Sequence, residues 1–343
     1  MKRIIIIIIL IFSKISIYAQ TGGNATFKFL DLSVSAKQAA LGGKVYTGLK
    51  NDIFQPAFNP ATLDSTMNNK LGVNYTAYLS DINYGNFAYA RRFKKIGLVY
   101  AAVSYINYGR FDYADTNGDR HGTFGASEGA LILGYTYRIP HSNWHIGANT
   151  KFILSALENY SATGLAFDIG FLYQNDKNGI ATGITARNFG LQLTTYQGTR
   201  EPLPFEVDLT FAKTFLHAPF KWFVTVENLQ KPEIAFVNTA HNTQDPNGNV
   251  IEEKIKFSDH LFRHFIVGVE LFPRKRFNVR AGYNFRRGAE LSQKDERFGS
   301  GFNFGFGLRL NKIEVNYAYG NYHYASGTNF ISISVDLNAF FKK

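Results

Sequence analysis

From residue 70 to the C-terminus, hydrophobic and polar residues alternate in fourteen short segments. The last segment shows the pattern clearly. Apolar residues occupy every second position from Ile331 to Phe341, with Ser332 and Ser334 among the polar residues between them. A period of two predicts β-strands, and about ten residues is the length that a tilted strand needs to cross a bilayer. A soluble β-sandwich also has one apolar and one polar face per strand, so alternation alone leaves both folds open.

The lengths of the connections separate the two folds. Tight connections at residues 94–95, 140–143 and 311–312 alternate with long ones at residues 109–127, 188–204 and 230–260. Outer-membrane barrels alternate in this way, with short periplasmic turns and long external loops, whereas a sandwich has no reason to do so. The sequence therefore favours an all-β fold, a transmembrane antiparallel β-barrel of fourteen strands within residues 70–341, located in the outer membrane.

In such a barrel the polar side of each strand faces the lumen, because an Arg facing lipid at the midplane costs about 2–4 kcal/mol. Residues of both charge signs lie on this side, which favours a lumen closed by ion pairs and hydrogen bonds. A polar conduction path is the alternative, although the single-sign rings typical of ion selectivity are missing. The residues expected to form this polar network are Arg138, Lys151, Asp168, Glu206, Asp208, Glu227, Glu270, Arg280, Arg309, Glu314 and Asp336.

The N-terminal part of the chain has a different character. Residues 1–19 combine Lys2 and Arg3 with an apolar run and end at Ala19, a pattern typical of a cleaved signal peptide for export. Residues 20–69 follow, and the capping box that starts at Ser35 with the glycines at 42–43 predicts one short helix. This segment either enters the lumen as a plug or extends into the periplasm.

Charge and composition narrow the function. Without residues 1–19 the chain has 34 Lys and Arg against 26 Asp and Glu, so the formal net charge falls from +11 to +8. No basic patch is interleaved with aromatic residues, so the excess indicates contact with lipid or lipopolysaccharide and not with nucleic acid. The absence of cysteine excludes disulfides and thiol catalysis.

Motifs for catalysis or metal binding find little support. His260 and His264 fall at a predicted loop-to-strand junction, where helical spacing would not place both on one face, so they indicate a structural or interfacial pair. Asp115, Asn117 and Asp119 copy the first ligands of a calcium loop, but the turn glycine and the distal glutamate are missing. We therefore expect no enzyme activity, no cofactor and no bound metal.

Long strings of this sequence carry a family resemblance. GGNATFKFLDLSVSAKQAALGG at residues 22–43 and NPATL at residues 59–63 resemble the N-terminal signature of the PorV/PorQ family, which is itself similar to FadL-type channels. Further matching strings begin at Tyr78, Tyr105, Gly147, Arg187 and Glu201 and are most similar to the PorQ branch. The resemblance implies a FadL-like barrel of fourteen strands and a place in the attachment complex of type IX secretion. There it would anchor a PorZ-type, lipopolysaccharide-binding surface protein, alongside a sortase-like protease and a PorV shuttle barrel.

The long loops supply candidate residues for such docking. Aromatic and aliphatic anchors within a polar rim are what a protein interface needs, although the same residues could pack the loops against each other over the barrel mouth. A FadL-type channel for hydrophobic or small polar molecules is the alternative function; transport in FadL fashion would require an apolar pocket and a lateral opening. The candidate docking residues are Phe111, Tyr113, Phe189, Tyr196, Phe236, Val237 and Ile251.

Overall fold

The computed structural model describes residues 25–215, 217–237, 243–244, 250–251, 254–291, 299–323 and 326–341. The expected signal peptide, residues 1–19, lies outside the described residues. Among the described residues, no helix has the length and apolar character needed to cross a membrane.

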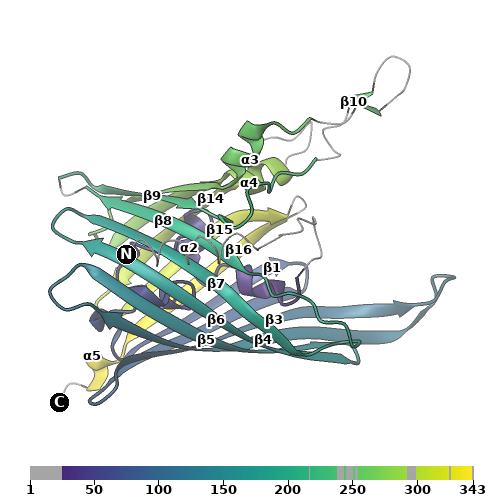
Figure 1. Cartoon of the computed structure of the whole chain (residues 1–343), viewed down its shortest axis with the longest axis horizontal. Coiled ribbons are helices and arrows are strands. Elements are labelled where there is room, and N and C mark those ends of the chain that lie inside the picture. Colours follow the sequence, from purple (N-terminus) through teal and green to yellow (C-terminus); the bar gives the residue numbers. More distant parts are fainter. Residues whose placement is uncertain are drawn as a thin grey trace, which may run out of the picture.

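Fourteen strands of the described chain close into one antiparallel barrel, which confirms the predicted fold (Figure 1). Each strand pairs with its neighbours in sequence, and the first and last pair with each other, for example at Val73 and Ile333. The strands are β1 (Lys70–Leu79), β2 (Ile82–Phe93), β3 (Gly97–Ala114), β4 (Arg120–Arg138), β5 (Trp144–Leu157), β6 (Tyr160–Asn175), β7 (Ile180–Thr194), β8 (Glu206–Thr214), β9 (Phe220–Val226), β12 (Phe265–Leu271), β13 (Phe277–Asn284), β14 (Phe302–Leu310), β15 (Ile313–His323) and β16 (Ser326–Asp336).

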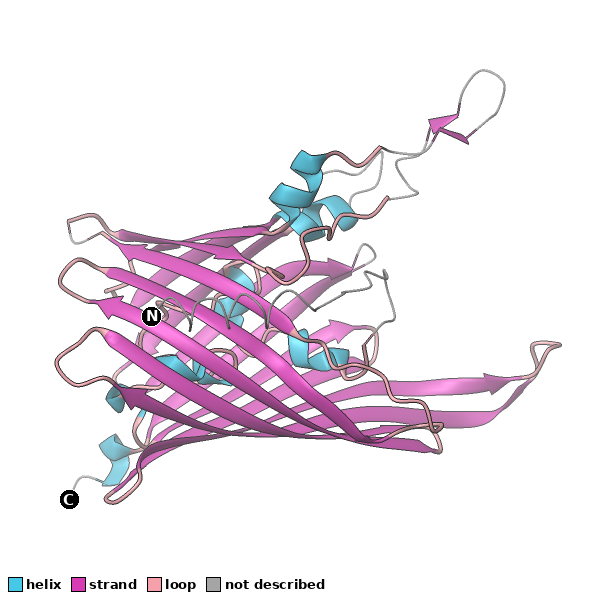
Figure 2. Cartoon of the chain, in the orientation of Figure 1, coloured by secondary structure: helices cyan, strands magenta, loops and turns pink. Residues whose placement is uncertain are grey.

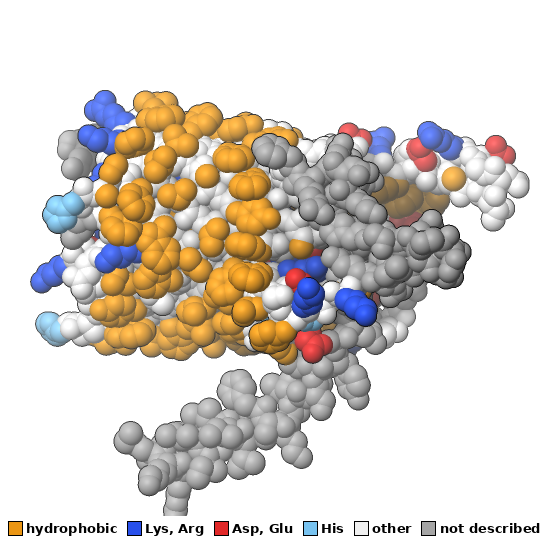
Figure 3. All heavy atoms as spheres, turned by 90° about the horizontal axis from the view of Figure 1, so that it is seen from above, with side chains coloured by type: hydrophobic (Ala, Val, Ile, Leu, Met, Phe, Trp, Pro, Cys, Tyr) orange, Lys and Arg blue, Asp and Glu red, His pale blue; other side chains and the backbone are white. Residues whose placement is uncertain are grey.

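The outer wall of the barrel is apolar. Outward-facing side chains such as Val73, Leu133, Phe304 and Ile331 are each 45–54% exposed. Figure 3 shows a broad belt of hydrophobic side chains around the barrel, with basic side chains beyond it at the end where the short turns lie. This distribution matches a bilayer, whose hydrocarbon region excludes charge.

The two ends of the barrel differ. At one end, called here the short-turn end, lie turns such as residues 94–96 and 311–312. At the other, the long-loop end, β3 and β4 continue as a hairpin that projects beyond the other strands (Figures 1 and 2). The expected loop at residues 109–127 is therefore wrong: only residues 115–119 connect the two strands. Cross-strand packing extends the pairing, since the rings of Phe111 and Tyr113 lie 5.3 and 4.9 Å from that of Phe124.

Helices interrupt the pattern of strands and loops at three other places. Strand β13 ends at Asn284, whose side chain accepts a hydrogen bond from the Arg287 N–H and caps helix α4 (Phe285–Glu290). Strand β16 ends at Asp336, and residues up to Phe341 form helix α5 (Asn338–Phe341) instead of continuing the strand. The connection between β9 and β12 contains β10 (Thr243–Gln244), β11 (Val250–Ile251) and helix α3 (Phe257–Arg263).

Residues 25–69 lie inside the barrel and are called here the plug (Figure 2). The predicted short helix is present as α2 (Ala36–Ala40): Ser35 Oγ accepts a hydrogen bond from the Gln38 N–H, and Gly42 and Gly43 follow at φ of 105° and 108°. Four 3₁₀ turns complete the plug, namely η1 (Lys28–Asp31), η2 (Gln55–Ala57), η3 (Pro60–Thr62) and η4 (Ser65–Met67).

The plug packs directly on the inner wall. Its backbone reaches the wall at Ala36, whose N–H donates to Ser332 Oγ at 2.7 Å. At Gly282 of β13, any Cβ would collide with the backbone of the plug at Leu41 and Gly42. Glycine at this lumen-facing position therefore permits an approach that a side chain would prevent.

Candidate functional site

A buried cluster of ion pairs joins the plug to the wall. Arg187 of β7 has no exposed side-chain surface, and its guanidinium pairs with Glu206 and lies 3.3 Å from Asp208. Its Cζ also lies 4.9 Å from the Tyr46 ring and 4.6 Å from the Phe58 ring, both in the plug. Two carboxylates and two aromatic faces thus surround a charge that would be costly to bury alone.

Lys44 of the plug extends this cluster. Its ammonium pairs with Glu206 and also with Glu227, at 2.9 Å from Oε2. Arg187 additionally lies 3.7 Å from Asp31 of the plug. Charges from the plug and the wall are therefore paired inside the barrel, and movement of the plug would separate Lys44 from Glu206 and Glu227.

Three further buried pairs are spaced around the interior. Lys37 of α2 lies 2.9 Å from Glu314 of β15, so this pair also links plug and wall. Lys151 lies 2.9 Å from Asp168 within the wall. The third pair joins Arg280 to Glu270, at 2.9 Å. These contacts make a filled, ion-paired interior at this level of the barrel.

The structure buries eight of the eleven expected lumen residues, and the other three lie at the short-turn end of the barrel. Arg138, Arg309 and Asp336 are in the lumen-facing phase, but each lies at the last residues of its strand, at the short-turn end. Arg309 keeps 41% of its side chain exposed, and Asp336 accepts a hydrogen bond from the Asn338 N–H at the start of α5. The eight buried residues are Lys151, Asp168, Glu206, Asp208, Glu227, Glu270, Arg280 and Glu314.

The central residue of the cluster, Arg187, was not among the residues predicted from the sequence. Arg187 directly precedes the loop expected at residues 188–204, whereas β7 continues to Thr194. The inward phase of Ala181, Gly183 and Thr185 would have placed Arg187 in the lumen. The plug lysines Lys37 and Lys44 could not be identified in this way, because no periodic pattern relates a non-strand segment to the wall.

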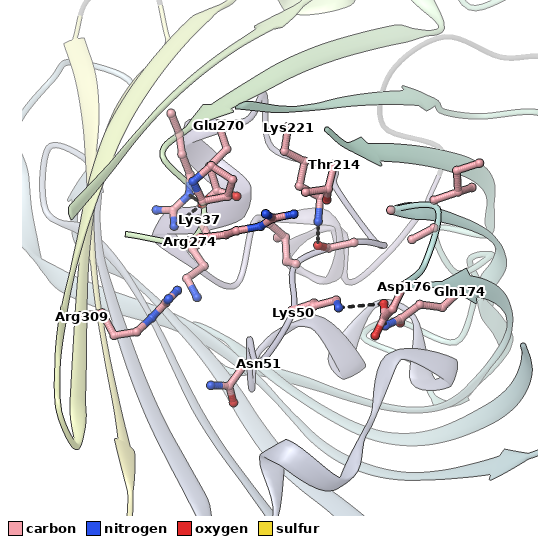
Figure 4. A pocket seen from close by; sticks show the side chains of 17 residues that line it. Lys37, Lys50, Asn51, Gln174, Asp176, Thr214, Lys221, Glu270, Arg274 and Arg309 are labelled. Atoms are coloured by element: carbon pink, nitrogen blue, oxygen red, sulfur yellow. Dashed lines mark hydrogen bonds and ion pairs between the residues drawn. The ribbon is translucent and has the colours of Figure 1, made fainter. Parts of the chain in front are cut away.

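A pocket opens at the short-turn end between the plug and the wall (Figure 4). Its volume is about 370 Å³, and its lining has six basic residues but only two acidic ones. Lys50 of the plug spans it to Asp176, 2.7 Å away. Lys221 is buried, and its ammonium donates to the Gly48 carbonyl oxygen of the plug. The charged lining residues are Lys37, Lys50, Lys221, Arg274, Arg280, Arg309, Asp176 and Glu270.

The pKa of Asp176, which lies in the turn between β6 and β7, is lowered. Burial acts to raise this pKa, but the hydrogen bond and positive charge of Lys50 outweigh it. Asp176 is thus held as a carboxylate, so the Lys50–Asp176 pair bridges plug and wall at the pocket mouth.

One of the expected docking residues lies in a strand, and another lies in its expected loop but packs inward. Phe189 belongs to β7, and its ring lies 5.8 Å from that of Phe167 on the outward face, so its expected place in a loop is wrong. Tyr196 is partly buried; its hydroxyl lies 2.6 Å from Ser155 Oγ and its ring packs on the apolar cluster inside the barrel. Tyr196 therefore helps to close the mouth of the barrel.

The other docking candidates lie on projecting segments. Phe111 and Tyr113 are 41% and 38% exposed on the β3–β4 hairpin, and Phe236 is 39% exposed. Val237 is half-buried. Ile251 lies in β11, and the structure describes its backbone alone. The exposed aromatic residues are thus divided between the hairpin and the segment before α3.

His260 and His264 make structural contacts, as expected. They lie on helix α3 and at its end, however, whereas a loop-to-strand junction was predicted. His260 lies within α3 and His264 caps its end. His260 Nδ1 accepts a hydrogen bond from the Ala235 N–H at 3.2 Å, and His264 Nδ1 donates to the Glu227 carbonyl oxygen at 2.6 Å.

The residues that copy a calcium loop form the tip of the β3–β4 hairpin instead. Asp115 accepts hydrogen bonds from the Asn117 and Asp119 N–H groups. The hydrogen bond from His121 and these backbone bonds lower the pKa of Asp115. Its carboxylate thus stabilises the turn.

These features define a transmembrane β-barrel whose interior is filled by its own N-terminal segment. No protein-family model and no curated protein matches the sequence. The fold is similar to two variants of the TodX monoaromatic hydrocarbon channel, deltaS2 (TM-score 0.55) and deltaS2S3 (TM-score 0.51). Each is 12% identical, and the match covers 88% of this chain and 97% of the channel. A Pseudomonas aeruginosa FadL homologue also matches, with 12% identity, a TM-score of 0.48 and coverage of 89% and 98%. At these identities the likeness concerns the fold.

Proposed function

We propose that this chain is a non-enzymatic outer-membrane channel for small molecules, closed at rest by residues 25–69. The main support is the combination of a barrel fold shared with TodX channels and a pocket between plug and wall. The volume of about 370 Å³ lies at the lower end of the range for small-molecule sites. Since the plug fills the interior, passage requires the plug to shift.

The substrate class follows from the chemistry of the pocket and interior. The basic lining of the pocket favours small polar molecules that carry negative charge. A hydrocarbon would gain little from this lining, since an exposed charged group such as Lys50 loses hydration when an apolar ligand covers it. Substrates of this barrel should thus differ from the monoaromatic hydrocarbons named for TodX.

A disulfide between plug and wall tests the proposed movement. An ideal Cβ at Gly268 of β12 would lie 3.2 Å from Leu41 Cβ, just below the roughly 3.5–4.5 Å that disulfides span. The chain has no cysteine of its own, so Leu41→Cys with Gly268→Cys gives one defined bond. In proteoliposomes, oxidation of this variant should stop the swelling caused by small organic anions, and reduction should restore it.

The two single-cysteine variants are the matched controls, because they carry the same side-chain changes without the crosslink. Their swelling should not respond to oxidant. Equal swelling of the oxidised and reduced double variant would contradict passage through plug movement. Failure of the wild-type protein to admit any small solute would contradict the channel itself.

A second function is supported by the projecting hairpin. We propose that the long-loop end also docks a surface protein, as the resemblance to the PorV/PorQ family implies for the attachment complex of type IX secretion. Phe111 and Tyr113 are exposed beyond the barrel on a paired, well-packed hairpin. Aromatic residues held on a rigid support are suitable anchors for a protein interface.

A further inference from the structure

Helix α3 has the reverse of the polarity expected for a helix in water. Its exposed residues include Phe257, Leu261 and Phe262, whose side chains are 82%, 46% and 55% exposed. Arg263 and the capping residue His264 are instead buried, at 6% and 9% exposure. A surface helix in water presents polar residues outward, so α3 has the polarity of the barrel wall and not that of a solvated loop.

The polar side of α3 is fixed to the rest of the protein. Arg263 Nη1 donates to the Phe236 carbonyl oxygen at 2.9 Å, and its guanidinium lies 6.0 Å from the Phe236 ring. His264 reaches the Glu227 carbonyl oxygen next to β9. These contacts hold the apolar side of the helix outward, so rotation about the helix axis would break several hydrogen bonds.

The apolar face of α3 is continuous with the outer wall. Strand β12 begins two residues after α3, and its outward row includes Val267 and Leu271. The ring of Phe262 lies 6.1 Å from that of Phe285, and further aromatic neighbours follow. Phe285 lies 4.9 Å from Tyr283, and Tyr283 lies 4.7 Å from Phe302 on the outer face of β14.

The wall is short where α3 is placed. Strands β9 and β12 have seven residues each, whereas β4 has 19 and β6 has 16. Seven residues at about 3.3 Å each and a tilt of about 45° span roughly 16 Å, against an apolar band of about 25 Å. Helices α3 and α4 lie at the long-loop end of this part of the wall (Figure 1).

We propose that α3 lies in the acyl chains of the outer leaflet and completes the lipid-facing wall above β9 and β12. Phe257, Leu261 and Phe262 are the residues in contact with lipid. Lipid is the occupant that fits because the helix face continues an existing lipid interface and supplies the height that the strands lack. The side chains on the face are apolar apart from Ser258, as expected for hydrocarbon contact.

Site-directed spin labelling tests this placement. The full barrel, free of native cysteine, is labelled with a nitroxide at Phe262→Cys and reconstituted into vesicles that contain lipopolysaccharide in the outer leaflet. Oxygen concentrates in hydrocarbon, whereas a nickel chelate stays in water. Labels at Val267→Cys, on the outer face of β12, and Asn117→Cys, at the hairpin tip, give the lipid and water references.

The label at residue 262 should show the oxygen-to-nickel accessibility ratio of residue 267 and not that of residue 117. The companion substitution Phe257→Asp should shift this ratio toward the water reference while the barrel stays folded, and Phe257→Leu should leave it unchanged. Free access of nickel to residue 262 would overturn the proposal. Protection from both reagents would overturn it as well, because it would mean that protein covers the face.

Discussion

At the scale of single residues, the interior depends on paired charges that come from distant parts of the chain. Arg187 contacts carboxylates from β8 and aromatic rings from the plug, so its charge is compensated from several sides. Buried pairs of this kind contribute little net stability compared with apolar packing, but the loss of one partner is costly because the other stays buried. Arg187 is therefore a position where one substitution should loosen both wall and plug.

We expect Arg187→Met to lower the unfolding free energy by about 3–5 kcal/mol, the usual cost of leaving a buried charge without its partner. Urea unfolding in lipid vesicles, followed by fluorescence of the two tryptophans, measures this difference. Arg138→Met is the matched control, because Arg138 is exposed at the short-turn end. Equal destabilisation by both substitutions would show that the pairs around Arg187 do not support the barrel.

At the scale of elements, the sequence predicted which segments form strands and which side faces outward, but not where several strands end. The alternation of apolar and polar residues that starts at Ile331 continues in the sequence up to Phe341. Strand β16 nevertheless ends at Asp336, whose carboxylate caps the next turn. Strands β3 and β4 are instead longer than predicted. They are held together by the stacking of Phe111 on Phe124, which depends on the register of the two strands. Strand ends depend on neighbours across the sheet, which a single segment does not reveal.

The hairpin gives a prediction for docking. Replacement of residues 112–123 by Asn-Gly should leave the barrel folded, since Phe111 and Phe124 are paired and Asn-Gly suits a two-residue turn. We expect this variant to release a surface-anchored partner protein from cells into the medium, as measured by immunoblotting of both fractions. Thr116→Ala is the control because it keeps the aromatic residues. Retention of the partner by the shortened hairpin would exclude this element as the docking site.

At the scale of the whole molecule, the sheet closes on itself and the lumen is filled by the plug. The sequence predicted the first of these features better than the second. Closure of the sheet follows from strands that pair in chain order, with β16 returning to β1. Filling of the lumen depends on Lys37 and Lys44. Lys37 pairs with Glu314, 277 positions later in the sequence, and Lys44 pairs with Glu206 and Glu227, 162 and 183 positions later. Local patterns therefore indicated a separate N-terminal segment, but they did not decide whether it enters the lumen or extends into the periplasm.

The orientation of the molecule in the membrane gives the last prediction. The hairpin tip at Asn117 lies at the long-loop end, whereas Lys95 and Lys275 lie in turns at the short-turn end. Outer-membrane barrels place their short turns in the periplasm, so Asn117→Cys should react with a membrane-impermeant maleimide on whole cells. Lys95→Cys and Lys275→Cys should react only after the outer membrane is permeabilised. Because the chain has no other cysteine, labelling reports these sites alone. Labelling of Lys95→Cys or Lys275→Cys on intact cells, with Asn117→Cys protected, would reverse the orientation and place the pocket of Lys50 and Lys221 at the cell surface.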